Sequence, residues 1–445
     1  MKVGMVSLGC SKNQVDAERL LAALTEAGYE LCGDEALCDA VIVNTCGFIE
    51  DAKKEAIEHI LYHAARRESG ALRLLVVTGC LAERYQKEMA EEIPEIDVIL
   101  GIGSNQKLVE AIRHALEGEK IRSFGAKENL ALVGRRILIG APYSAYLKIA
   151  EGCSNCCSFC AIPLIRGAFR SCGMEDVLAE ARELAARGVT ELNIVAQDTS
   201  RYGQDIAGKP MLPALLRRLC QIPGLHWIRL LYCYPQHISD ELLEVMAEEK
   251  KIVRYMDIPL QHVSASVLSS MNRTGNADTL REKIANIRAA LPGVALRTTL
   301  LAGYPGETEQ DFEMLCDFMR EMRFERLGCF AYSQEEGTPA ANMPGQIPEE
   351  LRRHRADIIM ETQMGIAAKI SQSMVGKTLE VLCEGRDAEQ NMYVGRSYMD
   401  APDIDTKVFF HADRPISAGE YCWVVIREAC DYDLIGRETA HESAK

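Results

Sequence analysis

Four cysteines lie within eight residues of the segment EGCSNCCSFCAIP, at Cys153, Cys156, Cys157 and Cys160. Two Cys-x2-Cys knuckles could hold zinc, but zinc ribbons usually leave about 15 to 20 residues between their knuckles. The adjacent Cys156 and Cys157 would also strain a tetrahedral site. The spacing Cys153-x3-Cys157-x2-Cys160 instead offers three thiolates, the usual protein ligands of iron–sulfur clusters. This pattern favours a 4Fe–4S cluster with one iron left open, and structural zinc is the alternative.

The composition indicates an ordinary globular protein of several domains. The chain has 445 residues and a net charge of −15, and about 150 residues per domain predicts about three domains. No window provides the roughly 18 uncharged apolar residues of a membrane helix, and the N-terminal MKVGMVSLGC is typical of a first β-strand rather than a signal peptide. We therefore expect a cytoplasmic protein without membrane contact, in a compartment where disulfides are rare. The seventeen cysteines then indicate metal sites, reactive thiols or small buried side chains.

Helix-like and strand-like segments alternate after Gly167. MEDVLAEARELAARG has the pattern of an amphipathic helix and TELNIVAQD that of a short strand, and similar pairs continue to ERLGCFAYS. This alternation predicts a parallel sheet with helical crossovers, here a partial (βα) TIM-type barrel. Active sites of such barrels lie at the carboxyl ends of the strands, where Gln197, Gln261, Arg297 and the segment Gly303–Glu307 are expected.

Three strand patterns in the N-terminal third each end in a cysteine. They are VGMVSLGC at Cys10, DAVIVNTC at Cys46 and LLVVTGC at Cys80, and a helix pattern follows each. This predicts a doubly wound parallel sheet, in which all strands end on one edge. The three thiols should therefore converge although they are distant in sequence. A lone cysteine is more often a small buried side chain, but three at equivalent positions favour a shared set of metal ligands.

From about Gly376 the pattern changes to short strands with turn signals, which predicts a small antiparallel β-barrel. Residues 376–445 contain fourteen acidic and eight basic side chains, a net charge of −6. Such a surface repels a phosphate backbone and attracts a basic protein. We expect the acidic run Asp400, Asp403 and Asp405 to dock that protein, and a solvated acidic turn is the alternative. The predicted domains are residues 1–125, 139–370 and 373–441.

These segments together resemble the radical S-adenosylmethionine (SAM) methylthiotransferase family. The resemblance spans almost the whole chain, and its last part is similar to the TRAM domain. The extra Cys156 and the Ser-Lys-Asn variant after Cys10 are the main departures, and neither touches a ligand position. The motifs that carry the resemblance are SLGCSKNQVDAE, VNTCGFI, TGCLAERY, EGCSNCCSFCAIPLIRG, AQDTSRYG, DIPLQH, RTTLLAGYPGETE and AYSQEEGTPAA.

The resemblance implies two 4Fe–4S clusters, an auxiliary one on Cys10, Cys46 and Cys80 and a SAM-activating one on Cys153, Cys157 and Cys160. One SAM would donate a methyl group and another would be cleaved to a radical. A sulfide or persulfide and an electron donor such as flavodoxin or ferredoxin would come from outside. No side chain is assigned as an acid or base, because an unactivated C–H bond has no acidic proton. The residues implied for SAM binding are Phe159, Gln197, Gln261, Arg297, Gly303 and Glu307.

Within the family, the chain is most similar to members that modify the β-carbon of an aspartate in the twelfth small-subunit ribosomal protein. A sister group modifies an adenosine of transfer RNA and would need a basic C-terminal surface, so it is the alternative. An iron–sulfur electron carrier or a zinc-stabilised binding module, neither of which would cleave SAM, is a further alternative. We interpret His59 and His63, four residues apart, as an exposed helix face rather than a metal pair.

Overall fold

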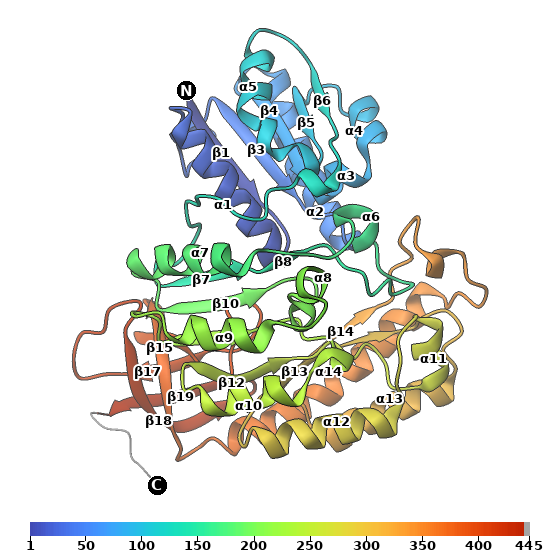
Figure 1. Cartoon of the computed structure of the whole chain (residues 1–445), viewed down its shortest axis with the longest axis vertical. Coiled ribbons are helices and arrows are strands. Elements are labelled where there is room, and N and C mark those ends of the chain that lie inside the picture. The colour runs from blue at the N-terminus through green and yellow to red at the C-terminus, as the bar shows by residue number, and fades with distance from the viewer. Residues whose placement is uncertain (440–445) are drawn as a thin grey trace.

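The computed structural model describes residues 1–439 as three units, each built on its own sheet (Figure 1). The predicted third domain ends at residue 441, so its last two residues lie outside the described part. Within the described residues, no helix is both long and apolar enough to cross a bilayer.

The N-terminal unit is a six-stranded parallel sheet with helices on both faces. Its strands have the order β2-β1-β3-β4-β5-β6. The second strand therefore lies on one side of β1, and all later strands are added on the other side. The strands are β1 (Lys2–Ser7), β2 (Glu30–Leu31), β3 (Ala40–Thr45), β4 (Leu74–Gly79), β5 (Val98–Leu100) and β6 (Ile121–Ser123). The helices are α1 (Ser11–Glu26), α2 (Glu50–Glu68), α3 (Cys80–Arg84), α4 (Gln86–Glu92) and α5 (Leu108–Leu116).

Alternation along the buried strands explains why both faces of this sheet are covered. In β3, Val41 and Val43 face Ile60 of α2, whereas Ile42 faces Leu24 of α1. Because side chains of a strand point alternately to the two faces, a continuous apolar strand needs a helix layer on each side. The predicted doubly wound sheet is confirmed.

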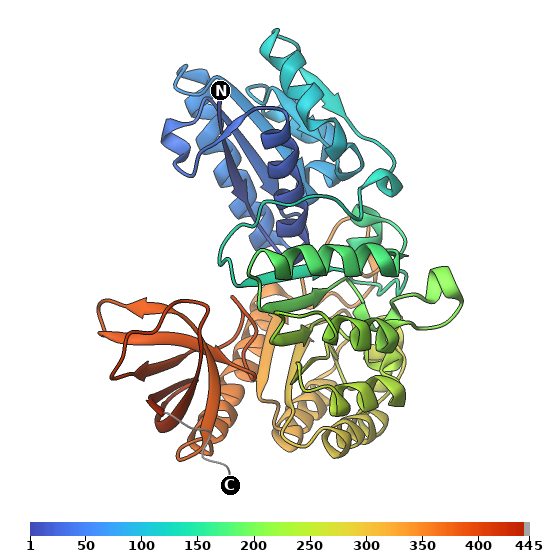
Figure 2. The same ribbon diagram turned by 60° about the vertical axis from the view of Figure 1, so that its left-hand side comes forward.

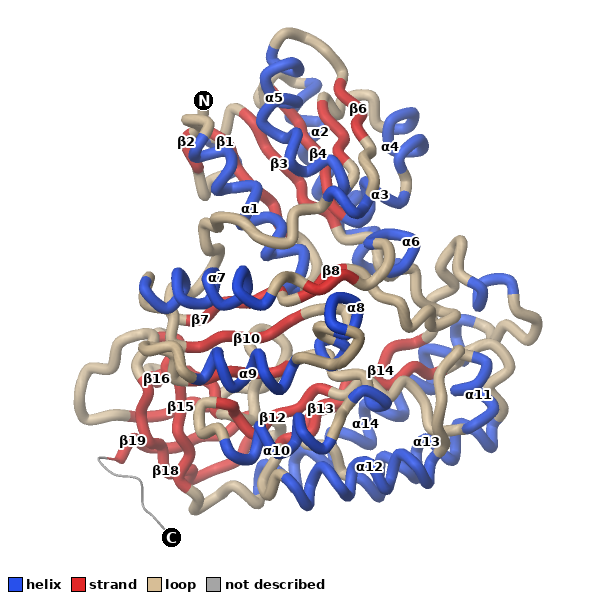
Figure 3. Tube along the Cα trace, in the orientation of Figure 1, coloured by secondary structure: helices blue, strands red, loops and turns tan. Residues whose placement is uncertain are grey.

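The central unit is an open parallel sheet whose six strands run in chain order, β7-β10-β11-β12-β13-β14. Figure 3 shows the helices gathered on its outer face, which confirms the partial barrel. The strands are β7 (Ser144–Lys148), β10 (Glu191–Val195), β11 (Trp227–Leu230), β12 (Ile252–Asp257), β13 (Ala295–Ala302) and β14 (Arg326–Ala331), with a small hairpin of β8 (Ala150–Glu151) and β9 (Arg170–Ser171). The helices are α6 (Ile162–Arg166), α7 (Met174–Ala186), α8 (Gln204–Ala207), α9 (Leu212–Cys220), α10 (Asp240–Glu248), α11 (Ala265–Ser270), α12 (Ala277–Ala290), α13 (Glu309–Met322) and α14 (Glu349–Gln372).

The C-terminal unit is a closed five-stranded barrel of order β15-β16-β17-β19-β18. All its pairs are antiparallel except β17 with β19. Figure 2 shows it packed against the central unit and away from the N-terminal sheet. Leu382 and Met399 of the barrel join Trp227 and Tyr255 of the central strands in one buried cluster. The strands are β15 (Thr378–Asp387), β16 (Met392–Ser397), β17 (Val408–His411), β18 (Tyr421–Cys430) and β19 (Asp433–Thr439).

Candidate functional site: two cysteine triads

The structure brings the first triad to neighbouring strand ends: Cys46 and Cys80 directly follow β3 and β4, and Cys10 lies three residues after the end of β1. The glycine before Cys10 makes this approach possible. Gly9 has a φ of +90°, and a Cβ on it would lie 2.7 Å from the Cβ of Cys46. Gly79, before Cys80, has a φ of +96°, and its Cβ would lie 2.5 Å from the carbonyl oxygen of Thr45. Only glycine fits such left-handed, close-packed positions without cost.

The environments of these three thiols differ. Burial raises the pKa of the Cys80 thiol to about 12, and burial also raises the pKa of Cys46. Desolvation opposes ionisation of Cys10 as well, but the positive charges of Lys12 and Arg166 outweigh it, and the pKa of Cys10 is lowered. A buried thiol becomes a thiolate only when a cation lies close to it. Cys46 and Cys80 therefore favour the neutral thiol in the protein alone, and a bound cation would be needed to hold them as thiolates.

The second triad lies in the loop between β8 and α6. The amide of Cys160 donates to the carbonyl of Cys157 at 3.0 Å, and the amide of Cys153 donates to the carbonyl of Gly167 at 3.1 Å. Burial raises the pKa of Cys153 to about 11 and that of Cys160 to about 12. Cys156 is exposed and has a φ of +50°, so the chain turns there.

An arginine contacts one sulfur of this second triad. Nη1 of Arg273 donates to Sγ of Cys157 at 3.5 Å, while its Nη2 donates to the carbonyl of Pro259 at 2.7 Å. The guanidinium lies 4.3 Å from the centre of the Tyr234 ring, so it is clamped between an aromatic face and the sulfur.

The chain segments that carry the two triads are in contact. Cys80 of the first forms a small buried cluster with Ala161, which directly follows Cys160 of the second, and with Ile165 of α6. Nη2 of Arg166, the last residue of α6, donates to Sγ of Cys80 at 3.4 Å. The N-terminal and central units therefore meet at the two cysteine loops.

A buried ion cluster surrounds this contact. Nζ of Lys148 lies between the carboxylates of Asp16 and Glu151, at 2.7 Å from Oε2 of Glu151. The guanidinium of Arg166 pairs with the same two carboxylates. Although burial opposes ionisation of Glu151, the charges of Arg166 and Lys148 hold its pKa well below the usual range. These four residues were not predicted from the sequence, where their only local signal is their nearness to the cysteine motifs.

The residues predicted to bind SAM do not all lie at one cavity. Phe159 and Gln261 line the cavity described below. Gln197 is held by Glu151, whose Oε1 accepts from its Nε2 at 3.0 Å. The Oε1 of Gln197 is buried and has no hydrogen-bond partner among the described residues. Arg297 forms an ion pair with Asp257, with Nη1 at 3.1 Å from Oδ1.

Gly303 and Glu307 shape the loop after β13. Gly303 has a φ of +77°, and a Cβ there would collide with Arg352 of α14. The Oε2 of Glu307 accepts from the amide of Gly303 at 2.9 Å, and its Oε1 accepts from Arg355 at 2.7 Å. Both residues therefore fix the backbone at the strand end, and the Glu307 carboxylate is already satisfied by protein donors.

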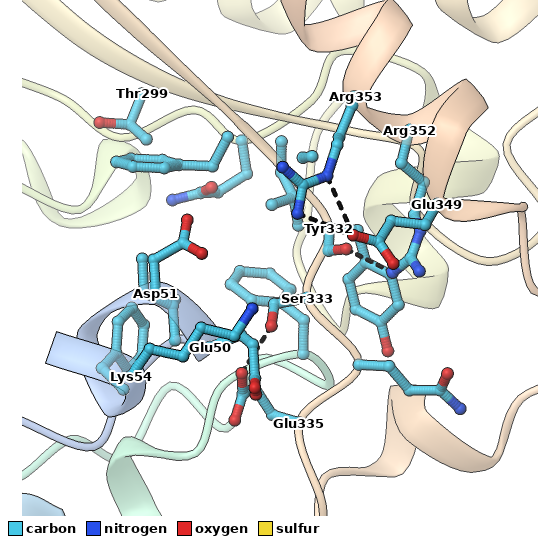
Figure 4. A pocket seen from close by; sticks show the side chains of 18 residues that line it. Glu50, Asp51, Lys54, Thr299, Tyr332, Ser333, Glu335, Glu349, Arg352 and Arg353 are labelled. Atoms are coloured by element: carbon cyan, nitrogen blue, oxygen red, sulfur yellow. Dashed lines mark hydrogen bonds and ion pairs between the residues drawn. The ribbon is translucent and has the colours of Figure 1, made fainter. Parts of the chain in front are cut away.

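A cavity of about 520 Å³ is lined in part by the segments that carry the two triads. Phe48, two residues after Cys46, lines it from one side, and Phe159, next to Cys160, lines it from another. Figure 4 shows charged side chains around it: Asp51 and Lys54 from α2 and Arg352 and Arg353 from α14, with Glu349 beside Arg353. The cavity thus joins both cysteine loops to solvent.

The acidic run predicted to dock a partner lies largely inside the contact between barrel and central sheet. Asp400 is buried against Arg326 and accepts from Ser397 Oγ at 2.7 Å. Asp405 accepts from the hydroxyl of Tyr255 at 2.6 Å and pairs with Arg297 at 3.5 Å. These two carboxylates are not available to a partner protein, which corrects that expectation for them. Asp403 is exposed and accepts from Tyr146 at 3.1 Å.

Three family models match the chain in succession. An uncharacterized protein family, UPF0004, matches residues 2–101, the radical SAM superfamily matches residues 147–319, and the TRAM domain matches residues 375–438. The first two matches contain the two cysteine triads.

Solved structures share the fold at low sequence identity. The radical SAM methyltransferase TsrM from Kitasatospora setae has a TM-score of 0.55 and 15% identity, with 85% of this chain and 78% of that chain covered. The cobalamin-dependent SAM radical enzyme OxsB has a TM-score of 0.50 and 12% identity, with 82% and 56% covered.

Curated relatives match over nearly the full length. A protein of Pelotomaculum thermopropionicum is 49% identical over 98% of this chain and 99% of its own, and one of Lachnoclostridium phytofermentans is 48% identical over the same shares. One from Geobacter sulfurreducens is 46% identical over 98% of each chain. All three are named ribosomal protein uS12 methylthiotransferase RimO. With the radical SAM match and the two cysteine triads, this similarity shows that the chain is a radical SAM enzyme of the RimO family of methylthiotransferases.

Proposed function

We propose that this enzyme adds a methylthio group to the β-carbon of an aspartate in ribosomal protein uS12. In this proposal Cys10, Cys46 and Cys80 hold an auxiliary 4Fe–4S cluster, and Cys153, Cys157 and Cys160 hold the cluster that binds SAM. The observation that carries the proposal is the buried contact of Cys80 with Ala161 and Ile165, which brings a cysteine of the first triad against the chain that follows the second.

The donor sets fit iron–sulfur clusters. Each triad offers three thiols, and thiolates are the usual ligands of such clusters. Burial raises the pKa of Cys80, Cys153 and Cys160, and a bound iron–sulfur cluster would supply the positive charge that holds these three as thiolates. An arginine N–H also reaches one sulfur in each triad, at Cys80 and Cys157, and hydrogen bonds to sulfur are a usual feature of such clusters.

When bound, the two clusters and SAM supply the methylthio group and the radical that removes a hydrogen atom from the aspartate. The chain's own residues hold these groups and the substrate carbon in line. Gln197 is proposed to accept a hydrogen bond from SAM, because its buried Oε1 has no partner among the described residues. Phe159 and Gln261 line the cavity, while Arg297, Gly303 and Glu307 are proposed to act by fixing the strand ends.

The cavity between α2 and α14 is the proposed entrance for the target loop of uS12. Its lining carries charges of both signs, which suits a peptide segment better than the sugar–phosphate backbone of transfer RNA. The C-terminal barrel, with its net charge of −6 across residues 376–445, also favours a basic protein over transfer RNA. A sulfide or persulfide and a donor such as flavodoxin or ferredoxin are proposed as external partners.

Anaerobic reconstitution with iron and sulfide tests this proposal. The loaded enzyme, a reductant and SAM should release 5′-deoxyadenosine and add a methylthio group to uS12, detected by mass spectrometry, but leave transfer RNA unmodified. Cys153→Ala should abolish deoxyadenosine release. The Cys46→Ala variant should still release 5′-deoxyadenosine but should not add the methylthio group to uS12. Methylthiolation retained by Cys46→Ala, or modification of transfer RNA in place of uS12, would refute the proposal.

A further inference from the structure

We propose that Arg166 is a positioning residue of the auxiliary cluster, which raises the reduction potential of that cluster through a hydrogen bond to the sulfur of Cys80. The inference rests on the proposed function, because it requires a cluster on Cys10, Cys46 and Cys80. It adds a role for a residue outside both triads.

The two arms of the Arg166 guanidinium have different partners. Nη1 donates to Asp16 at 2.8 Å and to both oxygens of Glu151 at 3.0 and 3.1 Å. Nη2 donates to Oδ1 of Asn13 at 3.2 Å and to Sγ of Cys80 at 3.4 Å. The side chain is 1% exposed. A planar fork held by five acceptors cannot rotate away, so the N–H that faces the sulfur is fixed in direction.

These partners come from both sides of the contact between the units. Asn13 and Asp16 lie on α1, just after Cys10, and Glu151 lies on β8, just before Cys153. Arg166 itself ends α6, six residues after Cys160. Figure 1 shows α6 beside α3, at the junction of the N-terminal and central units. Arg166 therefore links the chain segments next to one cysteine of each triad.

The expected direction of the effect follows from charge. A reduced cluster carries one more negative charge than an oxidised one, so a fixed N–H and a nearby cation stabilise the reduced form and raise the potential. Asp16 and Glu151 balance Arg166 and Lys148, all of them buried. Removal of Arg166 leaves an excess of negative charge beside Cys80. The potential should therefore become more negative.

The test uses the full chain with Cys153, Cys157 and Cys160 changed to alanine, so that only the auxiliary cluster can load. After anaerobic reconstitution, iron is counted and the midpoint potential is measured by redox titration followed by electron paramagnetic resonance. Arg166→Met should shift the potential to a more negative value and change the spectrum. Arg166→Lys, which keeps a charge but loses the fork, should give a smaller shift in the same direction.

Arg136→Met is the matched control. Arg136 is also buried at this contact and pairs with Glu18 at 3.1 Å and Glu180 at 2.6 Å, but it bonds to no sulfur in the described residues. Its variant should load iron and keep the potential of the parent.

Each outcome separates the hypotheses. An unchanged potential and spectrum in both Arg166 variants overturns the inference, as does an equal shift in Arg136→Met. Loss of iron in both Arg166 variants also overturns it, because Arg166 would then be needed to hold the cluster site rather than to set its potential. If the chain that lacks only Cys153, Cys157 and Cys160 binds no iron, then the proposed auxiliary cluster, and with it the proposed function, is wrong.

Discussion

Arg396 of the C-terminal barrel and Glu191 of the central sheet form a buried bidentate ion pair, with Nη2 and Nη1 at 2.6 and 3.0 Å from the two carboxylate oxygens. Arg229 approaches the same carboxylate at 3.4 Å. The side chains of Glu191 and Arg396 are 0% and 1% exposed. This ion pair links strand β16 of the barrel to strand β10 of the central sheet.

Arg396→Met should destabilise the protein, because it leaves the Glu191 carboxylate buried with less compensation. The expected loss is about 3–5 kcal/mol, measured as the free energy of unfolding in urea. Arg437→Met is the control, since Arg437 is a half-exposed barrel residue paired with exposed Asp413. Its expected change is within about 0.5 kcal/mol. Equal losses in both variants would contradict this role of the pair.

The same pair predicts a pH dependence of stability. Although burial alone would raise the pKa of Glu191, Arg396 and Arg229 lower it from 4.5 to about 2. A depressed folded-state pKa gives stability that is present above pH 4.5 and lost as the pH falls toward 2. The difference amounts to roughly 3 kcal/mol. Glu191→Gln removes this titration, so the gap in unfolding free energy between wild type and variant should narrow below about pH 4.5. A gap that stays constant from pH 7 to pH 3 would contradict the assignment.

Cys156→Ser should leave cluster loading unchanged. Cys156 is exposed at a turn of the cysteine loop, and the proposed ligands are its neighbours. Anaerobically loaded protein should hold about eight irons with or without this change, as measured by a colorimetric iron assay. Cys157→Ser, the adjacent control, should lower the count by about four. If Cys156→Ser loses as much iron as Cys157→Ser, the ligand set is wrong.

Gly9→Ala should disturb the first triad selectively. The added Cβ would meet Cys46 at 2.7 Å, and the φ of +90° adds strain. The expected cost is about 1–3 kcal/mol, together with loss of the auxiliary iron. Gly28→Ala supplies the control, because Gly28 has a φ of +86° but open space around its Cβ position. Retention of full iron content in Gly9→Ala would show that the close approach of the two strand ends is not needed.

Asp405→Asn should act on domain contact rather than on substrate affinity. Its carboxylate is held by Tyr255 and Arg297, so the expected effect is a loss of about 1–3 kcal/mol in the urea unfolding of the full chain. Asp403→Asn, at an exposed site, should change stability by less than about 0.5 kcal/mol. A weaker affinity for uS12 in Asp405→Asn, with unchanged stability, would restore the docking role.

The strand-end cysteines could be predicted because parallel topology alone brings them together. The strand pattern before each of Cys10, Cys46 and Cys80 carries this information locally. The contact of Arg166 with Asp16 carries no such signal, because the two residues are 150 positions apart and meet only when two units dock. The acidic run misled for a similar reason. The sequence shows that Asp400 and Asp405 are acidic, but not that Arg326, Arg297 and Tyr255 cover them in the folded chain.

His63 illustrates a missed periodicity. Its charged neighbours predict an exposed position, but the side chain is 0% exposed and its Nε2 lies 3.0 Å from Oε2 of Glu35. Ala56, Ile60, His63 and Ala64 form the buried stripe of α2. That spacing is the mark of a helix face toward the core, and it was present in the sequence.

The buried ions Asp16, Lys148, Glu151 and Arg166 have a consequence for motion. Prying the N-terminal unit from the central one would expose four charged groups and break their mutual bonds at once. Separation of the two units at this junction is therefore costly, and we expect the two cysteine loops to keep their relative positions. We therefore expect a substrate to reach the cavity between α2 and α14 without the two units opening at this junction.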